Sequence, residues 1–92
     1  MKYKIFKIKE GKIQQWKDWC IFLNEHKPEV LETLKEEKVT RECAVLRGDT
    51  VFYFMIGEGH PSSDTELNIQ HRKNVKECLE PVEGEVLFDF NL

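Results

Sequence analysis

The stretch from Thr40 to Gly57 reads TRECAVLRGDTVFYFMIG, and it decides the fold. Two runs rich in β-branched and aromatic residues, 40–47 and 50–57, flank the pair Gly48-Asp49. A two-residue connection that contains glycine, placed between two such runs, predicts a β-hairpin. This turn sets the expected cross-strand pairs, which are Arg41 with Ile56, Glu42 with Met55, Cys43 with Phe54, Ala44 with Tyr53, Val45 with Phe52 and Leu46 with Val51.

The segment before the hairpin has helical periodicity. Ile13, Trp16, Cys20 and Leu23 recur at intervals of three and four residues, which predicts an amphipathic helix over about 12–38. Proline lacks a backbone donor and disturbs the residue before it, so we expect this helix to be kinked or briefly broken at Pro28.

The segment after the hairpin predicts a second helix. Ser63 and Glu66 have the spacing of a capping box, which marks a helix start. The helix is expected to run to about Leu79 and to stop before Pro81. Its apolar stripe is Leu67, Val75, Cys78 and Leu79.

Alternating segments at both ends of the chain predict two further strands, 2–10 and 85–92. The expected order is therefore βαββαβ within a single domain, 1–92. Right-handed connections turn this order into an α+β, ferredoxin-like fold with a four-stranded antiparallel sheet and both helices on one face.

Composition narrows the classes of partner. The net charge is −3, and nucleic acids or anionic membranes require a basic surface, so neither partner is expected. No apolar run is long enough to span a bilayer, and the lysine-rich start does not resemble a signal peptide, so we expect a cytoplasmic protein. Cys20, Cys43 and Cys78 form no CxxC pair and are expected to be buried thiols, with no metal and no cofactor.

One face of the sheet is expected to meet the helices and the other to stay open. The pairs Val45–Phe52 and Cys43–Phe54 form the more apolar set and are assigned to the helix side, together with Phe6, Ile8 and the even-numbered residues of 86–92. The open face would then carry Tyr3, Ile5, Lys7, Glu42, Ala44, Leu46, Val51, Tyr53, Met55, Leu87, Asp89 and Asn91. The apolar members would form a patch larger than monomers usually expose, which predicts a homodimer with the two sheets face to face.

A family resemblance agrees with this architecture. The run from Trp16 to Gly57, in which a helix interrupted near Pro28 continues through 30–39 into the hairpin, resembles the dimeric α/β-barrel superfamily. That superfamily includes mutarotases, cofactor-independent monooxygenases, isomerases and small uncharacterised bacterial families, and the chain is most similar to one of the last group. The resemblance implies a homodimer and transfers no catalytic residue.

Three residues are candidates for catalysis. His71 lies on the buried stripe of the second helix and titrates near neutrality, which suits a general acid or base; the alternative is a neutral core histidine that bonds a backbone carbonyl. Glu42 and Tyr53 share the expected open face, where burial would raise the pKa of the carboxyl. Alternatively, Glu42 lies at the rim of a dimer.

Four further residues are candidates for ligand binding: Lys7, Met55, Asp89 and Trp19. Lys7 and Asp89 are expected on adjacent strands, where they form an ion pair in the alternative interpretation. Trp19 would wall a ligand site or serve ordinary helix packing.

Two functions remain open on this basis. One is a protein that binds a small molecule between the sheets, and the other is a cofactor-independent enzyme of the isomerase, mutarotase or monooxygenase type. RNA binding is disfavoured because 47–54 places Asp49, Thr50 and Val51 where an RNA-recognition strand needs small and aromatic residues.

Overall fold

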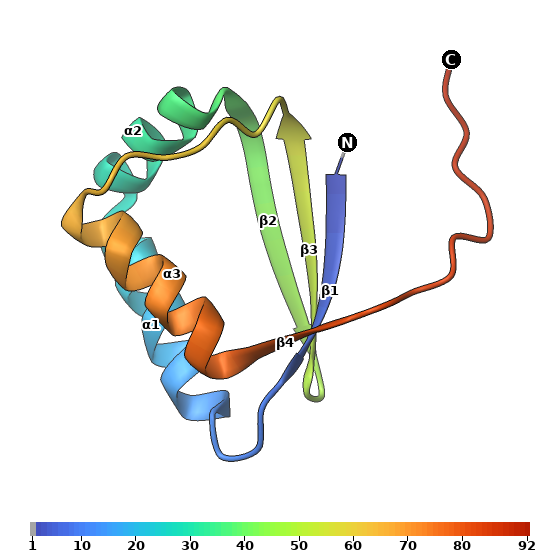
Figure 1. The fold of residues 1–92 in the computed structure, drawn as a ribbon, viewed down its shortest axis with the longest axis horizontal. Coiled ribbons are helices and arrows are strands. Elements are labelled where there is room, and N and C mark those ends of the chain that lie inside the picture. The colour runs from blue at the N-terminus through green and yellow to red at the C-terminus, as the bar shows by residue number, and fades with distance from the viewer. Residues whose placement is uncertain (1) are drawn as a thin grey trace.

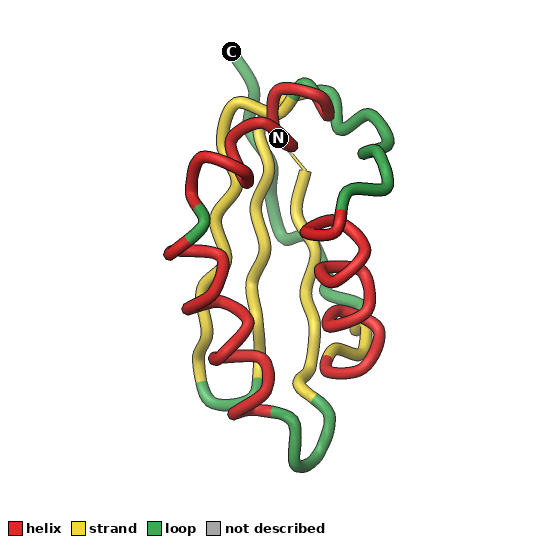
Figure 2. The backbone as a smooth tube through the Cα atoms, turned by 90° about the vertical axis from the view of Figure 1, so that its left-hand side faces the viewer, coloured by secondary structure: helices red, strands yellow, loops and turns green. Residues whose placement is uncertain are grey.

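The computed structural model describes residues 2–92, which form a sheet layer and a helix layer (Figure 1). All the helices lie on the same face of the sheet (Figure 2). The element order is βααββαβ, and the bounds are β1 (Lys2–Ile8), α1 (Ile13–Glu25), α2 (Lys27–Glu37), β2 (Val39–Arg47), β3 (Thr50–Gly57), α3 (Glu66–Cys78) and β4 (Leu79–Val82).

The sheet is antiparallel and its strand order is β2-β3-β1-β4. The hairpin of β2 and β3 turns at Gly48-Asp49, and all six cross-strand pairs expected from the sequence are present. Gly48 has a φ of 62°, a left-handed conformation that glycine adopts without steric cost. The predicted hairpin and its register are confirmed.

The expected long first helix is two helices, α1 and α2. The break lies at His26, whose φ of −116° and ψ of 35° are not helical and whose N–H donates to the carbonyls of Phe22 and Leu23. Pro28 falls in the first turn of α2, where backbone N–H groups have no helical partner, so proline costs nothing there. The predicted break near Pro28 is therefore confirmed.

The start of α3 differs from the capping-box prediction. Thr65 is the N-cap, and its Oγ1 accepts a hydrogen bond from the Asn68 N–H. Ser63 instead donates both its N–H and its hydroxyl to the carboxylate of Glu36 on α2. The capping-box interpretation was wrong: α3 begins two residues later than expected, with Thr65 as its cap, and the Ser63 N–H donates to Glu36 instead of Glu66.

The expected last strand over 85–92 is absent, and this prediction was wrong. β4 instead follows α3 directly and pairs with the Ile5–Ile8 part of β1. Pro81, which we expected to lie between helix and strand, is a member of β4. An edge strand tolerates proline because the N–H of every second residue faces away from the sheet and needs no partner.

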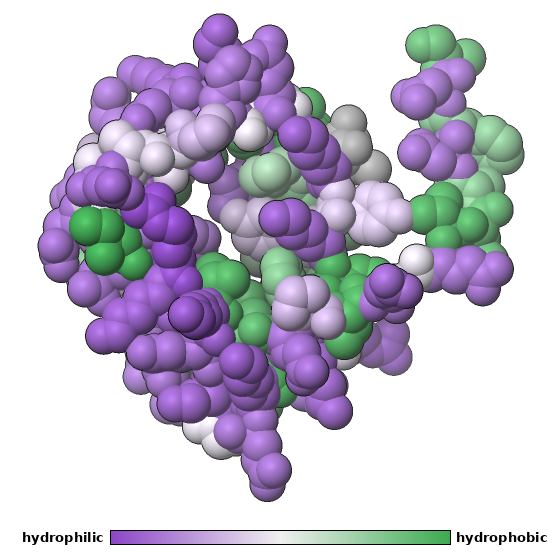
Figure 3. Space-filling view, viewed as in Figure 1, coloured by the Kyte–Doolittle hydropathy of each residue, from purple (hydrophilic) through white to green (hydrophobic). Residues whose placement is uncertain are grey.

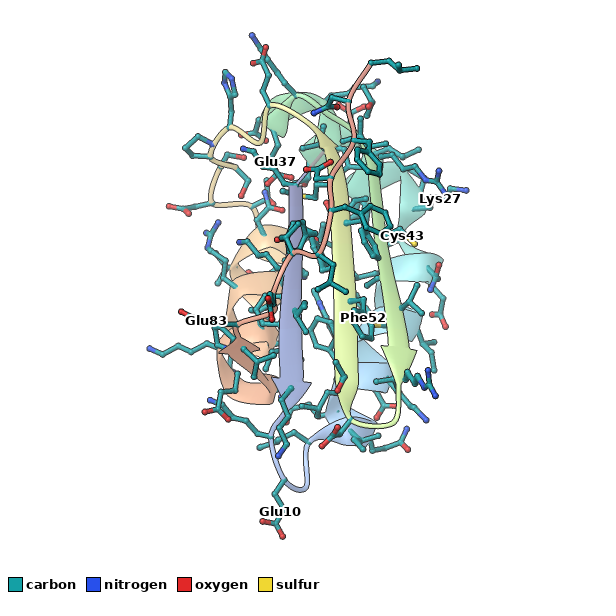
Figure 4. All side chains as sticks on the ribbon, turned by 90° about the vertical axis from the view of Figure 1, so that its right-hand side faces the viewer. Glu10, Lys27, Glu37, Cys43, Phe52 and Glu83 are labelled. Carbon is teal, nitrogen blue, oxygen red and sulfur yellow. The ribbon has the colours of Figure 1, made fainter. Side chains whose placement is uncertain are left out.

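The faces of β2 and β3 are exchanged relative to the prediction. Val51 is 1% exposed in the core and lies opposite Phe6, so Val51, Tyr53 and Glu42 face the helices. Cys43 and Phe52 lie on the open face, which Figure 4 views directly. The patch of Leu46, Val51, Met55, Ile5 and Leu87 expected on the open face therefore does not form. The apolar residues of the open face are instead Tyr3, Ile5, Cys43, Val45, Phe52, Phe54 and Ile56.

The core occupies one end of the space between the layers. Its buried members come from the end of β1, the start of β3, the first turns of α1 and the junction of α3 with β4. They are Ile8, Trp16, Trp19, Val51, Cys78 and Leu79. The other end of this space, under α2 and the first half of α3, is incompletely filled.

Within residues 2–92 no helix is long and apolar enough to cross a membrane. The three cysteines are free thiols; Cys78 is buried, whereas Cys20 and Cys43 are half-buried. The same residues contain no group of three or more His, Cys, Asp or Glu side chains arranged to hold a metal ion.

Candidate functional site

A cavity of about 380 Å³ lies between the sheet and the helices. Figure 3 shows apolar surface in the gap between the helix layer and the sheet. β4 pairs only with Ile5–Ile8, so the first residues of β1 have no strand neighbour on that side within the described chain. The lining residues are Lys4, Phe6, Trp16, Leu23, Val30, Thr33, Leu34, Glu37, Glu42, Tyr53, Met55, Ser62, Leu67, Asn68, His71, Arg72, Val75, Lys76 and Leu79.

Regular periodicity positions the lining side chains. In the sheet, alternate residues share a face, and the pairing of Lys4 with Tyr53 and of Glu42 with Met55 aligns them across three strands. On α3, Leu67, His71 and Val75 recur every four residues and therefore project from the same side of the helix. The sheet forms the floor of the cavity and the helices form its walls and roof.

Glu42 is an acidic group in a largely apolar enclosure. Burial raises the pKa of its carboxyl to about 7, and the nearby negative charge of Glu37 adds to this effect. The pKa of Glu37 is also raised, by burial and by its neighbour Glu36. Glu42 therefore exchanges a proton near neutral pH, so it can act either as an acceptor or as a donor of hydrogen bonds.

His71 is held by the indole of Trp19. The Trp19 Nε1–H donates to Nδ1 of His71 across 2.9 Å, and the two rings lie 6.0 Å apart. Burial, together with the positive charge of Arg72, lowers the pKa of His71 from its ordinary value. His71 is therefore a neutral imidazole at pH 7.

Polar contacts tie the walls of the cavity to one another. Asn68, which is 4% exposed, accepts a hydrogen bond from Thr33 Oγ1 and donates one to the Ser63 carbonyl, which joins α2 to α3. Arg72 donates to Ser62 Oγ and to the carboxylate of Asp64. These contacts fix the loop 58–65 over the end of the cavity.

A model of the DUF6176 family, described as a family of unknown function, matches residues 2–91. The chain belongs to this family. No significant match was found among curated proteins, and none among solved structures. Membership in a family of unknown function agrees with the resemblance to a small uncharacterised family.

This DUF6176 chain brings together four of the seven residues singled out from the sequence. Glu42, Tyr53, His71 and Met55 all line the cavity. They meet between the sheet and the helices, whereas Glu42, Tyr53 and Met55 were expected on the open face. Trp19 is buried beside the site, where it stacks on Phe22 and bonds His71.

Lys7 and Asp89 lie outside the cavity. Lys7 is on the open face and forms an exposed ion pair with Asp49 at 3.9 Å. Asp89 is in the segment after β4 rather than on a strand next to Lys7. The expected pairing of Lys7 with Asp89 on adjacent strands was therefore wrong.

Sequence reasoning missed several polar lining residues of the DUF6176 chain, namely Lys4, Glu37, Asn68 and Arg72. The sequence did contain a signal for Asn68: it directly follows Leu67, which is a member of the apolar stripe of α3. A signal also existed for Lys4, which alternates with Phe6 and Ile8 and therefore shares their face of β1. None existed for Glu37, because its position at the cavity depends on how α2 packs on β2.

Proposed function

We propose that this protein binds a small, largely apolar organic molecule in the cavity between its sheet and its helices. The observation that carries the proposal is the cavity itself, which is about 380 Å³ and lies within the range of natural ligand sites. Its walls are mostly aromatic and aliphatic, and a few polar groups converge on it from both layers. Glu42, Tyr53 and His71 are the proposed polar contacts, and Met55 with Trp16 forms part of the apolar wall.

A neutral fluorescent probe tests this proposal. N-phenyl-1-naphthylamine brightens in apolar surroundings, and we expect saturable binding to the wild-type protein. Val30 lines the cavity, so Val30→Phe fills part of it and should weaken binding at least about tenfold. Leu31 is exposed on α2, and Leu31→Phe is the matched control that should bind as the wild type does. Equal binding by both variants would place the probe elsewhere and contradict the proposal.

A second candidate function is proton transfer without a cofactor, and Glu42 favours it. A carboxyl with a pKa of about 7 inside an apolar cavity is suited to act as a general base at neutral pH. Its carboxylate would remove a proton from a carbon that lies between a carbonyl group and a carbon–carbon double bond, leaving the electron pair on a dienolate. The protonated Glu42 would then return the proton to the far carbon of that double bond, so the double bond moves next to the carbonyl group and the isomerisation is complete. Glu42→Gln should abolish such turnover without unfolding the protein, and an unchanged rate would exclude Glu42 from the reaction.

We also propose that the chain is a ferredoxin-like domain that forms a homodimer through the open face of its sheet. The strand order β2-β3-β1-β4 and the placement of all helices on one face support the domain type. The open face carries exposed Tyr3, Val45, Phe54 and Ile56 side by side on three neighbouring strands. A second copy that stacks its own sheet on this face would remove this patch from water.

The segment 83–92 supports the proposal that a second copy of the chain covers the open face. It alternates like a strand, yet Phe88 and Phe90 are mostly exposed and stack on each other, with ring centroids 5.1 Å apart. The segment crosses the open side of the sheet (Figure 4), where Gly84 approaches Ile5 so closely that a Cβ on Gly84 would lie 2.6 Å from Ile5 Cδ1. An apolar, strand-like segment beside an apolar sheet face matches what a self-complementary interface requires.

Molar mass in solution tests the dimer. Light scattering behind a sizing column should give twice 10.9 kDa, and the mass should persist on dilution. Ile56→Glu places a charge on the open face and should produce a monomer. Ile21→Glu, at an exposed position of α1, is the matched control and should leave the mass unchanged. A wild-type monomer over the whole concentration range would contradict the homodimer.

A further inference from the structure

The hydrogen bond between Trp19 and His71 determines which ring nitrogen of His71 carries the proton. An indole nitrogen can only donate, so Nδ1 of His71 must be the acceptor in the 2.9 Å contact. A neutral imidazole has one proton, and with Nδ1 unprotonated this proton lies on Nε2. Protonation of Nδ1 would set two N–H groups against each other, so the contact also opposes the charged form.

The remaining nitrogen of His71 is available to a ligand. Nδ1 is the only ring atom of His71 for which a hydrogen bond is formed within residues 2–92. His71 lines the cavity and is half-buried, so its Nε2–H needs no partner from the protein. It therefore supplies the cavity with a hydrogen-bond donor and not with a base.

The electrostatic surroundings restrict the partner of this donor. Two acidic residues, Glu37 and Glu42, line the cavity together with the basic residues Lys4, Arg72 and Lys76, so charges of both signs surround it and neither an anionic nor a cationic ligand is favoured by net charge. Arg72 is engaged by Asp64 and Ser62, so its charge is already partly compensated. The acceptor that suits an uncharged N–H in an apolar cavity is a neutral carbonyl oxygen.

We propose that Trp19 fixes His71 as the Nε2–H tautomer and that His71 thereby selects a neutral small molecule with a carbonyl oxygen. Trp19 acts through His71 and is a positioning residue, whereas His71 touches the ligand. This ligand class makes the proposed function more specific and depends on it, because both proposals concern binding in the same cavity. The tautomer does not depend on any ligand.

Nuclear magnetic resonance of ¹⁵N-histidine-labelled protein tests the tautomer directly. Long-range ¹H–¹⁵N spectra at pH 7.5 should show Nε2 protonated and Nδ1 unprotonated for His71. Trp19→Phe keeps an aromatic ring but removes the donor, and it should yield a mixture of tautomers and a raised His71 pKa. Trp16→Phe changes the other buried tryptophan, which also lines the cavity, and should leave the His71 signals in the wild-type pattern. An Nδ1–H tautomer or a charged His71 in the wild type would overturn the proposal.

Acetophenone and ethylbenzene, which have nearly the same shape and differ in the carbonyl oxygen, test the ligand class. The ratio of the two dissociation constants should be corrected for the different cost of moving each compound out of water. After this correction, wild-type protein should bind acetophenone about three- to tenfold more tightly than ethylbenzene. His71→Phe should abolish this preference and still bind both compounds. No preference in the wild type would overturn the carbonyl class but would leave cavity binding in place. Binding of neither compound would contradict the proposed function as well as the ligand class. The tautomer of His71 would not be affected by that outcome, because it is measured without a ligand.

Discussion

Gly57 and Lys38 are in direct backbone contact, because the Cα of Gly57 faces the carbonyl oxygen of Lys38 with no room for a side chain between them. Lys38 is itself left-handed, with a φ of 55°, and its carbonyl accepts the N–H of Glu58. This contact joins the end of α2 to the end of β3 and places the loop 58–65 over the cavity.

Replacement of Gly57 by alanine should destabilise the protein by about 3 kcal/mol, because a Cβ would overlap the Lys38 carbonyl and because the φ of 134° is accessible only to glycine. The free energy of unfolding in urea measures the effect. Gly48→Ala is the control: Gly48 has a positive φ but open space around it, so the cost should be about 1 kcal/mol. Equal losses for the two variants would show that the close approach to Lys38 is unimportant.

Ionisation of Glu42 should lower the stability of the fold as the pH rises towards neutrality. The folded pKa of about 7 lies above the unfolded value, so the folded state retains a proton that the unfolded state has already lost. This contribution is complete below the unfolded pKa and disappears as the pH rises from about 4.5 to 7. Because the carboxyl is partly solvated, we expect about 1 to 2 kcal/mol rather than the full shift.

The comparison of wild type with Glu42→Gln isolates that contribution. The variant cannot ionise at this position, so its free energy of unfolding should decline less between pH 5 and pH 8. Glu29→Gln, at an exposed position in the first turn of α2, should keep the wild-type pH profile. A Glu42→Gln profile parallel to that of the wild type would contradict the raised pKa.

Asn68 and Thr33 should be energetically coupled. Asn68→Ala removes the acceptor of the Thr33 hydroxyl and the donor to the Ser63 carbonyl, so it should cost about 2 kcal/mol. In a double-mutant cycle with Thr33→Val, the coupling energy should be about 1 kcal/mol. Additive effects of the two substitutions would show that the bond between α2 and α3 contributes nothing to stability.

Thr65, and not Ser63, should cap α3. Thr65→Ala removes the acceptor of the Asn68 N–H at the helix start and should cost about 1 kcal/mol in urea unfolding. Ser63→Ala removes only the hydroxyl bond to Glu36, while its backbone N–H still donates to the same carboxylate. We therefore expect the smaller loss for Ser63→Ala, and the reverse order would restore the capping-box interpretation.

The hairpin and the helix break were predictable because each depends on neighbouring residues. Gly48 and Asp49 determine the register of β2 against β3, and Pro28 marks the separation of α1 from α2. The strand expected over 85–92 failed because alternation shows only that a segment can pair. Leu79–Val82 already occupies the edge of β1, and Pro81 is acceptable there because that edge has no further neighbour.

The candidate site was predictable in its residue types and not in its location. His71, Glu42 and Tyr53 were identified by chemistry and by their place on a stripe or a face. Their meeting in one cavity depends on which face of the hairpin the helices cover.

The sequence by itself determined the local elements: the hairpin register, the helix break and the amphipathic stripes follow from turn residues, proline and periodicity within short segments. Only the tertiary structure decided which face of β2 and β3 is covered. Both faces of that hairpin are apolar, so hydrophobicity does not distinguish them. The choice is made by the pairing of Phe6 with Val51, 45 positions apart, which places Val51 in the core and brings Tyr53 and Glu42 under the helices.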